Sequence, residues 1–249
     1  MDNQLFFSFK TNTSEINIPD KLNNPFGLSI PEIAKIAAKE FQKFIAIESQ
    51  KWNYDFSSKK GKMFGVLVVK KANNTVGYLG TISGKLPNNE TCNQFAPSLF
   101  DESKDDFFLT KGMTELTKMG NEIEKSTTPN QINKLTEQRA QKSFSLQQQL
   151  FAHYRFLNRN GTEKNVLEIF ESSTQGNPPA AAGECAAPKL LQYAFKHQLK
   201  PIALAEFWWG NLENKEKEHK AFYPACKNRC RPILEFMLED SLLYKNASN

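Results

Sequence analysis

Three of the four cysteines in this 249-residue chain stand where they could bind one metal ion together. Cys185 lies in "GECAAPKLL", and Cys226 and Cys230 lie in "FYPACKNRC". Each segment leads into a predicted helix, whose N-terminal N–H groups and dipole favour the thiolate that zinc requires. Glu184 or His219 could supply a fourth ligand. The pattern therefore predicts a zinc site, and three buried or surface thiols without a metal are the alternative.

The pattern is partly that of the zinc nucleobase deaminases, in which the first ligand opens one helix and Pro-Cys-x-x-Cys opens the next. Two features differ in this chain. The catalytic glutamate of those enzymes follows the first ligand by two residues, a position that Ala187 occupies here. The pair "CKNRC" also has one residue more between its cysteines. A structural zinc site and a deaminase-like zinc hydrolase both remain open. Cys92, in "NNETCNQF", is expected to be a loop thiol.

Hydrophobic periodicity predicts the elements of the N-terminal part. Residues 28–51 have apolar side chains near a helical period behind a Ser-x-Pro-Glu start, which is typical of an amphipathic helix. Residues 63–70 and 75–83 are β-rich runs around "KKANNT" and predict a hairpin. Gly65, Gly77 and Gly80 would then mark bulges or close backbone approaches.

The C-terminal part predicts strand, helix, strand and helix in short succession, in "KNVLEIFES", "PKLLQYAFKHQ", "KPIALAEFWWG" and "RPILEFMLEDSLL". Pro188 and Pro232 each suit the first turn of a helix. Two parallel strand-helix units in one sheet would bring the three cysteines close together. We therefore expect an α+β fold, a mixed sheet with flanking helices that could form a deaminase-like layer.

Residues 101–158 are rich in Glu, Lys, Gln, Thr and Asn, with widely spaced apolar residues and a break at "STTPN". This composition predicts an inserted helical arm, either a pair of surface helices or a grip for RNA or a protein partner. On this division, 1–100 contributes a helix and a hairpin to the α/β layer, and 159–249 completes the same layer. A protein-binding module that uses the arm is a further functional alternative.

The chain has a formal charge of +5 and a pI of about 8.9, with lysines spread along its length. This charge permits RNA binding without requiring it. No apolar run is long enough to cross a bilayer, and the first residues do not have the pattern of a secretion signal. We therefore expect a cytoplasmic protein with no membrane partner and no DNA partner, in a compartment where stable disulfides are rare.

Trp208 and Trp209 end the predicted strand "IALAEFWW", which could place one ring in the core and the other at the surface. Core packing is the expected role of at least one of them. A solvent-facing indole beside basic side chains would form a platform on which RNA bases stack. The basic residues around it are Lys200, Lys220, Lys227, Arg229 and Arg231.

The run "PPAAAGECAAPKLLQYAFKHQLKPIALAEFWWG", followed by "FYPACKNRCRPILEFML", closely resembles the region before the catalytic domain in long bacterial pseudouridine synthases of the RluA type. The resemblance continues through "NNPFGLSIPEIAKIAAKEFQKFI", "GKMFGVLVVKKANNTVGYLGTISGKL" and "SLQQQLFAHYRFLNRNGTEKNVLEIF", so it covers nearly the whole chain.

The resemblance implies a role in RNA modification, the isomerisation of uridine in rRNA or tRNA, which needs no metal or organic cofactor. That chemistry depends on an Asp within an Arg-Leu-Asp motif. No arginine of this chain is followed by Leu-Asp; the arginines are Arg139, Arg155, Arg159, Arg229 and Arg231. We therefore expect an accessory module that binds RNA or a synthase catalytic domain and has no isomerase activity of its own.

Overall fold

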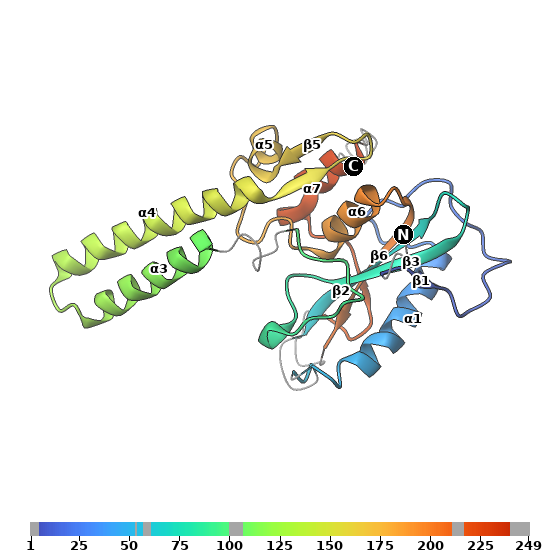
Figure 1. The fold of residues 1–249 in the computed structure, drawn as a ribbon, viewed down its shortest axis with the longest axis horizontal. Helices are drawn as coiled ribbons and strands as arrows, with labels where there is room; N and C mark the ends of the chain where they lie inside the picture. The colour runs from blue at the N-terminus through green and yellow to red at the C-terminus, as the bar shows by residue number, and fades with distance from the viewer. Residues whose placement is uncertain (1–4, 53, 57–60, 100–106, 211–216, 240–249) are drawn as a thin grey trace. The chain divides into compact units, whose positions relative to one another are not determined.

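The computed structural model describes residues 5–52, 54–56, 61–99, 107–210 and 217–239. The chain divides into two compact units. Met1–Leu99, Phe156–Glu163 and Ala181–Asn249 form the first unit, and Phe100–Arg155 with Lys164–Ala180 form the second. The first unit contains a sheet with helices on both faces (Figure 1), so the α+β class is confirmed.

The sheet of the first unit has the strand order β1-β3-β2-β6-β7. Its strands are β1 (Phe7–Ser8), β2 (Lys62–Lys70), β3 (Val76–Ile82), β6 (Lys200–Trp209) and β7 (Phe222–Tyr223). All neighbouring strands run antiparallel. The predicted hairpin is β2 with β3, and the predicted strand "KPIALAEFWWG" is β6, so both predictions are confirmed.

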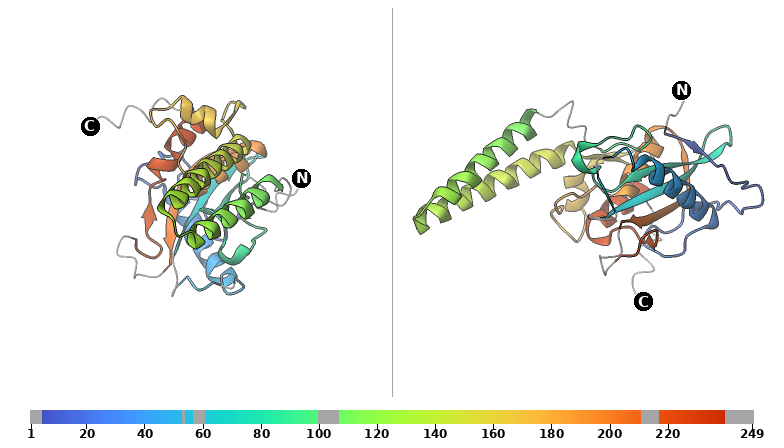
Figure 2. Two further views of the ribbon diagram at one scale, coloured as in Figure 1. Left: turned by 90° about the vertical axis from the view of Figure 1, so that its left-hand side faces the viewer. Right: turned by 90° about the horizontal axis from the view of Figure 1, so that it is seen from below.

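Helix α1 (Glu32–Glu48) covers one face of the sheet and confirms the predicted amphipathic helix (Figures 1 and 2). Its Phe41 ring packs edge-on against the rings of Phe64 and Phe207, each with centroids 6.4 Å away. A side chain at Gly80 would place its Cβ 2.3 Å from the Phe41 ring. Gly80 therefore marks a close approach between strand and helix, as its position in the sequence predicts.

Helix α6 (Ala186–Lys196) covers the opposite face, and α7 (Lys227–Leu238) packs against α6. Both predicted helices are thus confirmed. Gly65 of β2 lies directly under the start of α6, because a Cβ there would be 2.8 Å from the Cβ of Ala186. The side chains of Leu190, Leu191 and Ile233 are fully buried between these elements.

The strand predicted within "KNVLEIFES" is wrong over most of its length. A short strand β5 (Glu163–Asn165) pairs with β4 (Arg155–Leu157), and the chain then turns into helix α5 (Val166–Glu171). Asn165 and Glu168 form a capping box, in which each side chain accepts a hydrogen bond from the backbone N–H of the other, at 2.9 and 2.7 Å. The expected pair of parallel strand-helix units is therefore absent from the described sheet.

The second unit contains α3 (Phe107–Lys125) and α4 (Pro129–His153), which lie side by side as a helical hairpin (Figure 2). The predicted break at "STTPN" is confirmed, since α4 restarts at Pro129. Arg139 Nε donates a hydrogen bond to the carbonyl of Leu116 at 3.2 Å across the hairpin. None of the helices that the structure describes combines the length and the apolar character needed to cross a membrane.

A short 3-10 helix, η1 (Pro87–Asn89), follows β3 in the first unit.

The segment before α1 is attached to α1 by the buried carboxylate of Glu40. This carboxylate accepts hydrogen bonds from the backbone N–H groups of Lys10 and Thr11. Tyr78 also donates its hydroxyl to Glu40, at 3.4 Å. Burial, with the nearby Glu40 charge, raises the pKa of Tyr78 well above its usual range.

Candidate metal centre

Both cysteine segments begin helices at the same end of β6. Helix α6 runs back toward the start of β6, so its first residue lies near the end of that strand, and α7 begins after β6 and β7. Cys185 is the N-cap of α6 and Cys226 the N-cap of α7, while Cys230 lies one turn into α7. Pro188 is in the first turn of α6 as predicted. Pro232 lies deeper inside α7 than predicted, because α7 starts at Lys227.

Cys185, Cys226 and Cys230 lie near one another at the starts of α6 and α7. Each of these thiols shifts the pKa of the other two. The Cys185 and Cys230 thiols, helped by the backbone N–H groups of Arg229 and Asn228 at the start of α7, lower the pKa of Cys226 far below that of a free thiol. Hydrogen bonding to its neighbours instead raises the pKa of Cys230.

The turn after β3 holds the start of α6, and with it Cys185, in place. Ser83 Oγ accepts a hydrogen bond from the backbone N–H of Ala186 at 3.1 Å, and the N–H of Gly84 donates to the carbonyl of Glu184 at 2.7 Å. The buried ammonium of Lys189 donates to the carbonyls of Ile82 and Gly84 at 2.8 and 2.9 Å. Burial lowers the pKa of Lys189 to about 8. These bonds connect α6 to the sheet at several points near the thiol.

A fourth polar side chain, Glu206, lies beside the thiols and was missed by the sequence reasoning. It stands on β6 opposite Gly65 and is 5% exposed, so the carboxyl group is almost completely buried. Its Oε1 accepts a hydrogen bond from the backbone N–H of Ala187 at 2.9 Å. Its charge acts on Cys185 and Cys230. Burial raises the pKa of Glu206 to about 7.

Of the two expected fourth ligands, Glu184 directly precedes Cys185 at the start of α6, and His219 follows β6. The charge of Glu184 acts on Lys189. His219 lies near the end of β6, where its Nδ1 accepts a hydrogen bond from the N–H of Gly210 at 3.2 Å and its ring packs on Trp209. Burial lowers the pKa of His219. Glu206 is therefore a third candidate for the fourth ligand, beside Glu184 and His219, because its charge acts on Cys185 and Cys230.

The predicted RNA-binding residues lie around the end of β6, but neither tryptophan ring faces solvent. Trp208 is 7% exposed and Trp209 is 8% exposed, so the expectation of a solvent-facing indole is wrong. The rings project to opposite faces of the strand, and each face is covered. The ammonium of Lys220 lies over the Trp209 ring, 5.5 Å from the ring centroid, and Lys220 is exposed.

Three of the predicted basic residues stay accessible on the cysteine side of this region. Lys220, Lys227 and Arg229 are exposed, and the last two stand in the first turn of α7 between the two cysteines. Arg231 is engaged instead with Glu235, at 2.8 Å. RNA binding by these residues stays a prediction.

The donor set has the chemistry of a zinc site, because three thiols with a carboxyl or a water are common zinc ligands. In the part of the chain that the structure describes, no group of three or more His, Cys, Asp or Glu side chains is arranged to hold a metal ion as it stands. Zinc binding would therefore require the thiols to lose their protons and turn toward the ion.

The other histidines and the fourth cysteine lie elsewhere. His153 ends α4 and packs against Phe108 in the second unit, and His197 follows α6, exposed, with its Nδ1 2.8 Å from the carbonyl of Tyr193. Cys92 is half-buried against the core on the α1 face. Comparison of the chain with protein-family models, curated proteins and solved structures finds no match.

Proposed function

We propose that this chain is an accessory module of RNA modification built around a zinc ion, which Cys185, Cys226, Cys230 and Glu206 bind. The observation that supports it most strongly is the convergence of three thiols and a buried carboxyl from α6, α7 and β6. Three thiols gathered without a disulfide suit a soft metal ion.

The charge of such a centre is compatible with its surroundings. Three thiolates and a carboxylate would carry four negative charges against the two positive charges of zinc. The N-termini of α6 and α7 each present about half a positive charge, and Cys185 and Cys226 are the N-caps of these helices.

The RNA part of the proposal rests on the resemblance to pseudouridine synthases and on the exposed cations beside the cluster. Lys227 and Arg229 extend from the same turn that contains Cys226 and Cys230. A metal that fixes this turn would fix the two cations in space, and fixed cations bind phosphates at a lower entropic cost. RNA binding should then weaken steeply as the salt concentration rises.

Elemental analysis of the purified chain tests the metal, and a fluorescence titration with rRNA fragments and tRNA tests the RNA. We expect stoichiometric zinc that is lost in Cys226→Ser and kept in Cys92→Ser, whose thiol lies apart from the cluster. We expect salt-sensitive RNA affinity that falls when Lys227 and Arg229 are both replaced by Gln. A chain without zinc, or without salt-sensitive RNA affinity, contradicts the corresponding half of the proposal.

A second candidate function is a deaminase-like zinc hydrolase, and the position of Glu206 specifically favours it. In the zinc deaminases the general acid and base follows the first ligand by two residues, the position of Ala187 here. The carboxyl of Glu206 lies beside Ala187, because it accepts a hydrogen bond from the backbone N–H of that residue. Here Glu206 would carry protons instead of binding zinc.

Ammonia release from nucleobases separates the two roles of Glu206. For a hydrolase, Glu206→Gln keeps zinc and abolishes turnover. For an accessory module, no substrate yields ammonia, and Glu206→Gln weakens zinc binding. The pseudouridine assay should show no turnover in either case, since the chain has no Arg-Leu-Asp motif.

A further inference from the structure

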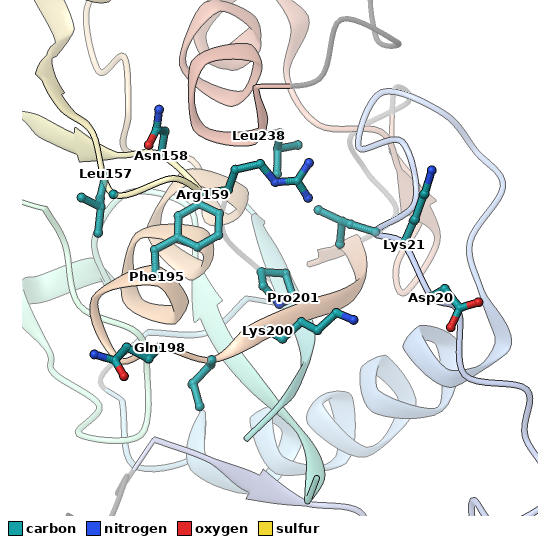
Figure 3. Close-up of a pocket in the computed structure, with 13 residues that line it drawn as sticks. Asp20, Lys21, Leu157, Asn158, Arg159, Phe195, Gln198, Lys200, Pro201 and Leu238 are labelled. Atoms are coloured by element: carbon teal, nitrogen blue, oxygen red, sulfur yellow. The ribbon is translucent and has the colours of Figure 1, made fainter. Parts of the chain in front are cut away.

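A cavity of about 420 Å³ lies at the end of α6 opposite the cysteines. Helix α6 has 11 residues, so about 16 Å separates its two ends. The cavity wall comes from the loop before α1, the loop after β4, the end of α6 and the first residues of β6 (Figure 3). All of these segments belong to the first unit. The volume falls in the range of small-molecule binding sites.

Three cations from three separate segments line this cavity. They are Lys21, Arg159 and Lys200, accompanied by the single carboxylate of Asp20. In Figure 3 the guanidinium of Arg159 and the ammonium of Lys200 point toward the side that Asp20 and Lys21 form. Within the described residues none of the three cations forms a salt bridge. The lining therefore carries three positive charges against one negative charge, an excess that suits a phosphate.

Apolar side chains form the rest of the wall. Phe195, Pro201 and Leu238 line the cavity beside the cations, and Leu157 lies at its other side (Figure 3). An inorganic anion would make no use of these groups. A phosphate ester with a flat, apolar part would contact both kinds of lining, with the ring of Phe195 available for packing.

The segment that presents Arg159 is firmly held. The backbone N–H of Arg159 donates to the carbonyl of Met237 at 2.9 Å. Asn158 Oδ1 accepts hydrogen bonds from the N–H groups of Asn160 and Thr162 at 3.0 and 2.7 Å, which fixes the turn on either side. The backbone that carries Arg159 is therefore fixed before a ligand binds, which lowers the entropic cost of binding.

We propose that this cavity binds a nucleotide unit, with its phosphate between Arg159, Lys200 and Lys21 and its base against the wall of Phe195 and Pro201. The site contains none of the proposed zinc ligands, so it does not depend on the metal centre. The nucleotide could be free or part of an RNA strand, and the two sources share the chemistry that the cavity recognises.

Isothermal titration calorimetry of the full chain tests the proposal with AMP, adenosine, inorganic phosphate and a short single-stranded RNA. We expect AMP to bind more tightly than adenosine or phosphate. Arg159→Gln and Lys200→Gln should each weaken AMP binding by about tenfold or more, because each removes a charge-assisted contact. Lys39→Gln is the matched control: it removes the same charge from an exposed position on α1. Circular dichroism confirms that the variants are folded.

Tighter binding of the RNA than of AMP assigns the site to an RNA strand, and equal binding assigns it to the nucleotide alone. The proposal is overturned if neither AMP nor RNA binds. It is equally overturned if Arg159→Gln and Lys200→Gln bind like Lys39→Gln, or if phosphate binds as tightly as AMP.

Discussion

Replacement of Gly65 by alanine should disturb both the fold and the cysteine cluster, because Gly65 lies under the first turn of α6. The added Cβ would be 2.8 Å from the Cβ of Ala186, 3.2 Å from Leu190 Cδ1 and 3.4 Å from Glu206 Cγ. Carbon atoms pack best at about 3.5–4.0 Å. The overlap with Ala186 is therefore several tenths of an ångström, and it falls on a backbone-bound methyl group that cannot rotate away.

The start of α6 must then move away from β2. Overpacking of this kind costs about 1–3 kcal/mol of unfolding free energy. The lower entropy of alanine in the unfolded chain offsets about 0.4–1 kcal/mol of that cost. We expect Gly65→Ala to be less stable by roughly 1–2 kcal/mol, and to bind zinc more weakly because Cys185 precedes the displaced residue.

Urea unfolding followed by tryptophan fluorescence measures this effect, since all three tryptophans lie in the first unit. The double variant Gly65→Ala/Ala186→Gly removes the methyl group that clashes and should recover much of the lost stability. Gly27→Ala is the control, because its nearest atom would be 3.6 Å from the new Cβ. If Gly65→Ala unfolds at the wild-type urea concentration, or if Ala186→Gly brings no recovery, the packing that we describe for α6 is incorrect.

Three further substitutions test the fold. Gly80→Ala places a Cβ 2.3 Å from the rigid ring of Phe41 and should destabilise the first unit by about 1–3 kcal/mol in urea unfolding. A second substitution, Phe41→Leu, should recover part of this loss. Equal stability of Gly80→Ala and the wild type would contradict the packing of α1 on the sheet. Glu40→Ala leaves the backbone N–H groups of Lys10 and Thr11 without their acceptor and should lower the free energy of unfolding by about 1–3 kcal/mol. Amide hydrogen exchange should become faster in the segment before α1. Unchanged exchange there would argue against the attachment of this segment to Glu40. In Gly120→Ala the added Cβ would have only Arg139 Nε nearby, at 3.7 Å, so the substitution should stabilise α3 by about 0.5–1 kcal/mol. Helix content during heating measures this effect. A loss of helix would show that α3 is closely packed at this position.

Local periodicity was sufficient to predict most elements of the first unit. The alternation around "KKANNT" located β2 and β3, and the helical spacing of 28–51 located α1, because each element buries one continuous face. The glycines of the hairpin also predicted where helices come close to the sheet, at Gly65 and Gly80. Such features depend on neighbours in sequence or on the absence of a side chain.

The errors came from signals that were weighted wrongly. "KNVLEIFES" was interpreted by its alternation, whereas Asn165 and Glu168 have the spacing of a capping box and start α5. One of the two tryptophan rings was expected at the surface, but β6 lies inside the sheet and both of its faces are covered.

Glu206 was missed although it left a trace in the sequence. It is the single charged residue within the apolar run "PIALAEFWW", where a carboxyl is costly to bury without a purpose. Glu206 lies near Cys185 because α6 packs on the sheet, which brings Glu206 into contact with Ala187, 19 positions earlier in the chain. Sequence spacing alone does not reveal such contacts.

Titration of the metal-free chain with Co²⁺ tests the proposed centre most directly. Cobalt replaces zinc in thiolate sites and gives a sulfur-to-metal charge-transfer absorption that grows with the number of thiolate ligands. We predict saturation at one ion per chain, a weaker band in each of Cys185→Ser, Cys226→Ser and Cys230→Ser, and an unchanged band in Cys92→Ser. Glu206→Gln should keep the sulfur band and shift the visible bands of the metal. Absence of a charge-transfer band in the wild-type chain would contradict a metal centre at these cysteines.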